Sequence, residues 1–386
     1  MNRRQFIQAT SLASAAALLS LSVNAADAGN EIVLSLDPSP EHPRLSEGAF
    51  VTLKSGKILF IYTRFRGGAA DHSAADLVST ASADGGRTWD SEPKMEVANP
   101  GGENVMSVSL LRLKNGRIAL LYLVKNSLLD CRPVVRFSDD EAATWSAPVT
   151  VTTAPGYFVL NNDRVIQLKS GRLVVPLALH RSRGNDGKSY KQWDSRGIAV
   201  WCLSDDDGKT WREAADWWAM PVRSTSGFQE PGVVELADGK LFSWARTDQG
   251  AQFGCWSDDD GEHWPMLTKT ELASPNSPTS IKRIHGTTDL LAVFNDHSGK
   301  FAFPKGKRTP LVAAISRDSG KTWPRRKVIE DDPQGWYCYT AIHFTDDAVL
   351  LAYCAGDPKI GHLNRTRIRR LACKMGAGIS GMELEI

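Results

Sequence analysis

Ser204-Asp-Asp206-Asp-Gly208-Lys-Thr210-Trp211 is one of five copies of an eight-residue pattern in this chain of 386 residues. The pattern has Asp two residues after Ser, usually Gly two residues after that Asp, and Thr-Trp at its end. The other copies occupy 82–89, 138–145, 257–264 and 316–323, and successive copies begin 56, 66, 53 and 59 residues apart. A repeat of this length indicates one supersecondary unit, repeated around a ring or along an array.

Each copy lies between short apolar or β-branched runs, such as 198–203 before the third copy, which is typical of a β-hairpin. In such a turn the Asp carboxylate accepts backbone N–H bonds, and Gly adopts positive φ without a steric clash. Five of the twelve Trp residues occupy the last position of the pattern, which favours a shared packing role. A calcium loop at 205–207 is disfavoured because the downstream Glu and the required number of ligands are missing. Ala142 replaces the Gly in one copy, and His263 replaces the Thr in another.

The repeats predict an all-β fold, a six-bladed β-propeller of four-stranded antiparallel blades. Five blades carry the pattern and one blade lacks it. Blade-like segments lie before the first copy, at about 31–81, and after the last copy, at about 324–373. A propeller accommodates a long chain because it adds blades radially and does not enlarge one core. We expect residues 29–386 to form this single domain, with the early strand at 32–36 pairing with the C-terminal strands.

Residues 1–28 read as a signal peptide. Arg3-Arg4 precedes an apolar, small-residue stretch at 12–23, and Ala-x-Ala-like cleavage sites end at Ala25 or Ala28. The paired Arg before a Phe is typical of a twin-arginine leader, and the apolar stretch is short for a spanning helix. The sequence therefore predicts an exported bacterial protein, periplasmic or secreted, without membrane insertion of the mature chain.

The charge balance and the cysteines exclude several kinds of partner. Without Arg3, Arg4 and Asp27, 44 basic residues stand against 43 acidic ones, which argues against a nucleic-acid or membrane-surface partner. The six cysteines are widely spaced, without metal-ligand spacing, so we expect no metal and no other cofactor. They are either buried thiols or disulfides, with Cys338 and Cys354 the best pair.

The repeated pattern resembles the Asp-box of the sialidase (neuraminidase) superfamily, which closes the outer hairpin of propeller blades. The resemblance covers essentially the whole mature chain. It implies an exo-acting glycoside hydrolase that removes terminal sialic acid, or a related acidic sugar, from a glycan or sialoglycoconjugate. In that family the catalytic groups come from the inner strands of different blades, so they are distant in sequence.

The first blade contains the start of the family's site. Pro43-Arg44-Leu45 resembles the family's Arg-Ile-Pro, but Leu-Ser follows the Arg here. The next strand ends with Arg64, and a loop with Asp71 follows. The resemblance makes Asp71 the candidate acid/base, with Asp76 in reserve, and places Arg44 and Arg64 among the substrate-binding residues.

The later blades supply the other functional residues that the resemblance implies. Glu230, a strand, Asp-Gly, a second strand and Arg246 form a sialidase-like stretch, and Arg308 matches the family's third Arg. In the last blade Tyr339 is the candidate nucleophile, with Tyr337 as the alternative. Further substrate-binding candidates lie at inner-strand starts or in the long loop of the third blade, and they are Asn104, Met106, Asn162, Arg164 and Trp193.

The chemistry explains why these residue types belong together. Three guanidinium groups can hold the carboxylate of sialic acid through charge-assisted hydrogen bonds. A neutral Tyr, polarised by Glu230, can approach the anomeric carbon without repulsion from that carboxylate and react with retention, while Asp71 protonates the leaving group. Two alternatives stay open, an Asp-box hydrolase or lyase for another acidic glycan such as a uronate, and a non-catalytic glycan-binding propeller.

Overall fold

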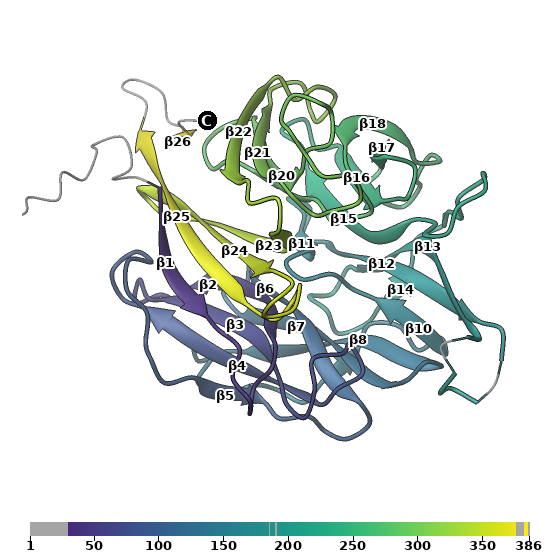
Figure 1. Cartoon of the computed structure of the whole chain (residues 1–386). Helices are drawn as coiled ribbons and strands as arrows, with labels where there is room; N and C mark the ends of the chain where they lie inside the picture. The colour runs from purple at the N-terminus through teal and green to yellow at the C-terminus, as the bar shows by residue number, and fades with distance from the viewer. Residues whose placement is uncertain (1–29, 185, 190, 376–381, 385–386) are drawn as a thin grey trace, which may run out of the picture.

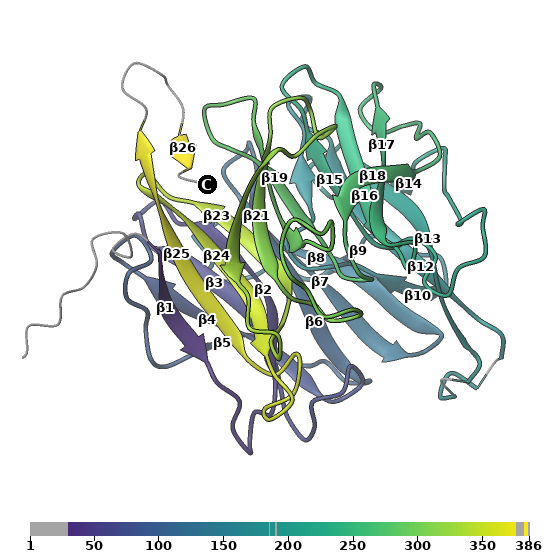
Figure 2. The ribbon, with the colours of Figure 1, turned by 45° about the horizontal axis from the view of Figure 1, so that its top comes forward.

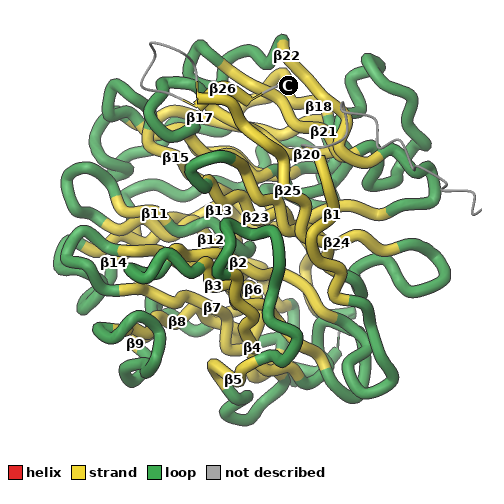
Figure 3. The backbone as a smooth tube through the Cα atoms, turned by 90° about the vertical axis from the view of Figure 1, so that its left-hand side faces the viewer, coloured by secondary structure: helices red, strands yellow, loops and turns green. Residues whose placement is uncertain are grey.

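The computed structural model describes residues 30–184, 186–189, 191–375 and 382–384. The predicted leader at 1–28 lies outside these residues. The described residues form strands, turns and loops without a helix (Figure 3), and thus contain no helix of the length and apolarity needed to cross a membrane. The expected all-β class is confirmed.

The strands form antiparallel sheets that follow the order of the chain. Three sheets have four strands each. The first contains β2 (Leu45–Thr52), β3 (Ile58–Phe65), β4 (Ala75–Ser82) and β5 (Lys94–Val97). The second contains β15 (Gln229–Glu235), β16 (Leu241–Arg246), β17 (Ala251–Ser257) and β18 (Thr268–Ala273), and the third contains β19 (Ser280–Arg283), β20 (Leu290–Asn295), β21 (Leu311–Ser316) and β22 (Arg325–Glu330).

A nine-stranded sheet joins two further groups of strands through one short parallel pairing, between β8 and β10. Its strands are β6 (Asn104–Arg112), β7 (Ile118–Ser127), β8 (Asp130–Ser138), β9 (Val149–Thr150), β10 (Gly156–Val159), β11 (Ile166–Gln167), β12 (Leu173–Ser182), β13 (Trp193–Ser204) and β14 (Arg212–Glu213). The last sheet contains β23 (Trp336–Phe344), β24 (Ala348–Gly356), β25 (Thr366–Met375), β26 (Met382–Leu384) and the first strand, β1 (Asn30–Leu36). The predicted pairing of this early strand with the C-terminal strands is therefore confirmed, because β1 pairs with β25.

Apolar residues occupy both faces of the middle strands, because each sheet packs against a neighbour on either side. All nine residues of β24 are buried, and so are the first six residues of β3. The hydrophobic clusters lie between neighbouring groups of strands, and the largest of them lies mostly between the two groups of the nine-stranded sheet. One cluster joins Val51 of β2 to Val108 of β6, and another joins Phe60 of β3 to Leu350 of β24.

The repeated pattern forms the turns that the sequence predicts. In the third copy the two oxygens of Asp206 accept hydrogen bonds from the backbone N–H and the hydroxyl of Thr210, at 2.9 and 2.6 Å. Gly208 has a φ of +83°, which explains the preference for Gly at this position. In the fourth copy His263 takes the place of Thr and keeps the bond to Asp259 at 2.7 Å.

The first strands of the successive groups are β2, β6, β15, β19 and β23. These first strands lie next to one another near the middle of the molecule (Figures 1 and 2). β2 contacts β6 and β23, and β19 contacts β15 and β23. Side chains at the beginning of these strands, which are far apart in the sequence, therefore meet in one place.

Candidate active site

The first strands carry a shared irregularity where they begin. The strand ladders shift register between Ser46 and Ala49, between Met106 and Ser109, between Gln229 and Gly232, and between Cys338 and Ala341. One non-glycine residue with a left-handed backbone lies within each bulge, namely Glu47 (φ +57°), Ser107 (+61°), Glu230 (+49°) and Tyr339 (+57°). Such conformations cost of order 1–3 kcal/mol each and cluster at functional sites. All four residues line the same cavity, of about 130 Å³.

Tyr339 and Glu230 form the centre of this cavity. The Tyr339 hydroxyl donates a hydrogen bond to Glu230 Oε1 at 3.2 Å, and Arg246 Nη2 donates to the same oxygen at 2.9 Å. Burial, together with the nearby Glu230 charge, raises the pKa of Tyr339 well above its usual range. The phenol is therefore neutral at neutral pH and is polarised by a carboxylate.

Arg246 keeps most of its hydrogen-bonding capacity. Among the described residues its Nε and Nη1 have no hydrogen-bond partner, and neither has Glu230 Oε2. Arg308 lies beside the same pair, with its guanidinium carbon 5.5 Å from the centre of the Tyr339 ring and 5.4 Å from that of Trp336. The arrangement brings two guanidinium groups next to the Tyr–Glu pair.

Arg44 also reaches this region, but its guanidinium group is already occupied. Its Nη1 donates to Asp71 Oδ1 at 2.5 Å and its Nη2 to Glu47 Oε1 at 2.6 Å. Its Nε donates to Ser46 Oγ at 2.9 Å, and the group stacks over Phe65 at 4.4 Å. Burial opposes the charge of Arg44, yet the two carboxylates raise the pKa of this guanidinium above its usual value.

Asp71 lies at the mouth of the cavity, with 64 % of its side chain exposed. Desolvation raises the pKa of Asp71, but the charge and hydrogen bond of Arg44 outweigh it and the net shift is downward. Asn104 Nδ2 and Lys125 Nζ hold the Asp71 carbonyl at 2.8 and 3.0 Å. The reserve candidate, Asp76, instead forms a two-bond ion pair with Arg66 outside the cavity.

Aromatic residues form another wall. Trp193 stacks on His180 with ring centres 4.6 Å apart, and Tyr157 meets Trp193 edge-on at 5.7 Å. Burial lowers the pKa of His180 to about 4, so the imidazole is neutral at neutral pH. Met106 also lines the cavity. The predicted Met106 and Trp193 thus both belong to the lining of this cavity.

Other predicted residues lie outside the lining of this cavity. Asn104 holds the Asp71 loop, as described above, and Asn162 Nδ2 donates to the carbonyls of Gly48 and Tyr339 at 2.8 and 3.1 Å. Arg64, at the end of β3, pairs in the ladder with Leu45 and Asp76. Asn104 and Asn162 therefore support the site without lining it, whereas the Arg64 side chain neither lines the cavity nor bonds, among the described residues, to one that does.

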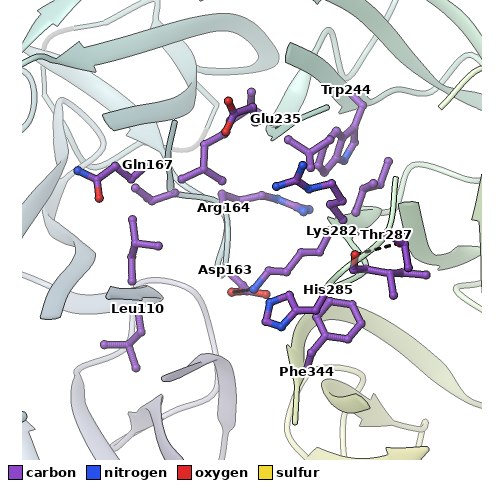
Figure 4. A pocket seen from close by; sticks show the side chains of 18 of the residues that line it. Leu110, Asp163, Arg164, Gln167, Glu235, Trp244, Lys282, His285, Thr287 and Phe344 are labelled. Atoms are coloured by element: carbon purple, nitrogen blue, oxygen red, sulfur yellow. Dashed lines mark hydrogen bonds and ion pairs between the residues drawn. The ribbon is translucent and has the colours of Figure 1, made fainter. Parts of the chain in front are cut away.

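Arg164 lines a second cavity, of about 510 Å³, formed further along the first strands (Figure 4). Arg164 extends between the other lining residues toward Trp244, and Lys282 reaches Asp163 below it (Figure 4). Burial lowers the pKa of Arg164 to about 10. Arg164 thus lines the second cavity, although its charge lies near enough to Glu230 and Arg246 of the first cavity to interact with both.

The alternative nucleophile, Tyr337, belongs to the core. It is 3 % exposed and packs edge-on against Tyr353 at 6.3 Å, so only Tyr339 of the two lines the cavity.

All six cysteines are free thiols. In the part of the chain that the structure describes, no group of three or more His, Cys, Asp or Glu side chains could hold a metal ion.

Sequence reasoning missed Glu47, Tyr157 and His180 as lining residues. Glu47 had a signal, since it is the one charged residue of its strand and lies three positions after Arg44. Tyr157 and His180 had none, because both lie in runs that read as ordinary strands.

A family model and individual relatives of known name point to the same group of proteins. A family model described as a BNR repeat-like domain matches residues 102–351. A sialidase of Bacteroides fragilis is 24 % identical over 327 residues, which cover 74 % of this chain and 55 % of that protein. A sialidase of Micromonospora viridifaciens is 26 % identical over 227 residues, covering 54 % of this chain and 31 % of that protein. The chain thus spans about half of the length of the Bacteroides relative, and less of the second.

Solved structures share the fold. A protein of unknown function from Dyadobacter fermentans superposes with a TM-score of 0.68 at 18 % identity, covering 89 % of this chain and all of that one. A Hadza microbial sialidase superposes with a TM-score of 0.65 at 19 % identity, covering 86 % of this chain and 66 % of that one. The fold is therefore that of sialidases, which are propeller proteins. Since the family model covers more than half of the sequence, the chain belongs to the BNR repeat-like domain family of the sialidase superfamily.

Proposed function

We propose that this protein is an exo-acting glycoside hydrolase of the sialidase type, which removes a terminal sialic acid or a related acidic sugar from a glycan with retention. The observation that carries the proposal is the hydrogen bond of 3.2 Å from the Tyr339 hydroxyl to Glu230, in a cavity lined by Arg246 and with Arg308 over the Tyr339 ring. A binding module needs the arginines but has no use for a buried phenol paired with a carboxylate.

In the proposed reaction Tyr339 attacks the anomeric carbon while its proton passes to Glu230. The bond to the leaving-group oxygen breaks, and Asp71 donates a proton to that oxygen. Water, deprotonated by Asp71, then attacks the anomeric carbon, the bond from that carbon to the Tyr339 oxygen breaks, and Glu230 returns the proton to the phenolate. Asp71 must therefore be protonated before the first step, and Glu230 must be ionised.

The acidic group of the substrate would bind to Arg246 and Arg308. Arg246 has two nitrogens without a partner among the described residues, and Arg308 lies over the Tyr339 ring. Guanidinium groups hold carboxylates with two parallel bonds where geometry allows. Met106 and the Trp193 ring would contact the rest of the sugar.

We also infer that six blades form a closed ring and that residues 29–386 are one exported domain. The hydrophobic clusters support the ring, because each joins neighbouring groups of strands, and one of them joins the first sheet to the last. The export proposal depends on the leader at 1–28, which reads as a twin-arginine signal.

A second candidate function is hydrolysis or elimination at another acidic glycan, such as a uronate. The observation that favours it is the occupation of Arg44 by Glu47 and Asp71, which leaves the expected clamp of three arginines incomplete.

The test is turnover of an aryl α-sialoside by purified protein, with Tyr339→Phe as the variant and Tyr337→Phe as the matched control on the same strand. We expect wild type and Tyr337→Phe to release the phenol, and Tyr339→Phe to lose at least about 100-fold in kcat. Proton NMR of the first product gives the anomer and tests retention. If folded wild type does not turn over the sialoside but does turn over an aryl uronide, the second candidate replaces the first.

A further inference from the structure

Glu47 is a carboxylate inside the cavity that none of the proposed steps uses. It is 5 % exposed and lies three residues after Arg44, at the bulge of β2. Its Oε1 accepts from Arg44 Nη2 at 2.6 Å, and its Oε2 accepts from the Ser107 hydroxyl at 2.5 Å. Since Ser107 is itself the bulge residue of β6, two neighbouring sheets hold this carboxylate in place.

Arg44 has little capacity left for a ligand. A guanidinium group has five N–H donors, and Arg44 makes four hydrogen bonds, to Ser46, Glu47, Asp71 and the carbonyl of Ala69. Only 2 % of its side chain is exposed. An incoming carboxylate would have to displace Glu47 or Asp71 and would meet their negative charges.

Arg246 keeps the hydrogen-bonding capacity that Arg44 lacks. It makes one hydrogen bond, to Glu230, and two of its nitrogens have no partner in the described part of the chain. The two arginines therefore offer different chemistry to a sugar. Arg246 can bind a carboxylate, whereas at Arg44 it is Glu47 that lines the cavity, and it presents only acceptor oxygens.

We propose that Glu47 is a specificity-determining residue, which occupies the anion-binding edge of Arg44 so that the acidic group of the substrate is held by Arg246 and Arg308 alone. Glu47, which lines the cavity, then accepts a hydrogen bond from a hydroxyl group of the sugar. This inference rests on the proposed glycosidase function. It narrows the substrate class to acidic sugars that present a hydroxyl group to Glu47.

The experiment compares two probes that differ only in charge, the 2,3-unsaturated analogue of sialic acid and its methyl ester. Calorimetry gives the ratio of their affinities for wild type, Glu47→Ala and Glu47→Gln. The matched control is Glu235→Gln, which changes a carboxylate that lines the second cavity. We expect both Glu47 variants to raise the preference for the acid about tenfold or more, equivalent to one additional charge-assisted contact, and Glu235→Gln to leave the ratio unchanged.

An unchanged or reduced preference for the acid in both Glu47 variants would overturn the inference, because Glu47 would then only position Arg44. Absence of binding of either probe to wild type and to both variants would overturn it as well. Thermal melts identify a variant that fails to fold, and the second variant then decides. The affinity ratio does not depend on turnover. Loss of the proposed function would therefore appear separately, as an inactive wild type with a measurable ratio.

Discussion

The carboxylate of Asp163 lies 2.7 Å from the ammonium group of Lys282, although 119 positions separate the two residues in the chain. Both groups also bind the backbone of Ile342, since Asp163 Oδ2 accepts from its N–H at 2.9 Å and Lys282 Nζ donates to its carbonyl at 2.8 Å. Ile342 follows Tyr339 by three residues on β23. The ion pair thus holds the strand that presents the candidate nucleophile.

This relationship predicts that Asp163→Asn reduces both stability and turnover. The substitution leaves the ammonium group of Lys282 without its charge partner, and we expect the free energy of unfolding to fall by about 1–3 kcal/mol. Because Tyr339 would be held less firmly, kcat should fall more than KM rises. Chemical denaturation and steady-state kinetics measure the two effects. An Asp163→Asn protein with wild-type kcat would show that the pair supports the fold alone.

The sequence predicted the sheets better than the site. The Asp-box turns follow from local chemistry, because Asp206 bonds only to residues within the same turn. The positions of Glu230 and Tyr339 could be predicted from the family resemblance. The sequence could not show that Arg44 is occupied by Glu47, because this contact depends on the backbone of a bulge. Nor could it show that Arg164 lines a different cavity, since that depends on the path of the segment between β10 and β11, which carries this side chain.

Asp206→Ala tests the structural role of the repeated pattern. The substitution removes the acceptor of the bonds from Thr210 and Ser204, and we expect the free energy of unfolding to fall by about 1–3 kcal/mol, with KM unchanged. Asp258→Asn, at an exposed position of another turn, is the control. Equal stability of Asp206→Ala and wild type in urea would contradict the structural role.

The same turn has a pH dependence with a defined sign. The hydrogen bond from the Thr210 hydroxyl is the main reason why the pKa of Asp206 is lowered to about 2. A carboxyl with a depressed pKa contributes stability that is fully present above its unfolded pKa of about 3.9 and is lost as pH falls toward 2. We therefore expect the stability difference between wild type and Asp206→Ala to shrink between pH 4 and pH 2. A difference that stays constant over this window would contradict the shift.

Trp193→Ala tests the aromatic wall of the cavity. The indole stacks on His180 at 4.6 Å and lines the cavity, and such ring contacts contribute about 0.5–1.5 kcal/mol. We expect KM to rise roughly 3- to 10-fold with kcat little changed. Trp217→Ala is the control, because Trp217 is 59 % exposed and lies outside the cavity lining. A fall in kcat without a change in KM would instead assign Trp193 to the reaction step.

The ionisation of Asp71 should determine how activity depends on pH. Although desolvation raises the pKa of Asp71, the neighbouring Arg44 charge makes the net shift downward, and the proposed acid step needs the protonated form. The ratio kcat/KM should therefore fall as pH rises above the acid range. Arg44→Met removes the charge that lowers this pKa, so the falling limb should move to higher pH. Arg66→Met, which touches Asp76 instead, should leave it in place. A limb that does not move in Arg44→Met would mean that another group donates the proton.

Cys338 and Cys354 lie directly opposite each other in the ladder of β23 and β24, and each is 1 % exposed. Directly opposite residues of antiparallel strands have Cα atoms about 4.5–5.5 Å apart, within the range of about 4.4–6.8 Å that a disulfide spans. We therefore expect a disulfide oxidant to join these two thiols, with the loss of two hydrogen atoms measured by mass spectrometry. Cys354→Ser should abolish the mass change and Cys202→Ser should not. Since Cys338 precedes Tyr339, the bond would fix the strand pair beside the candidate nucleophile; six free thiols after oxidation would show that the pair cannot close.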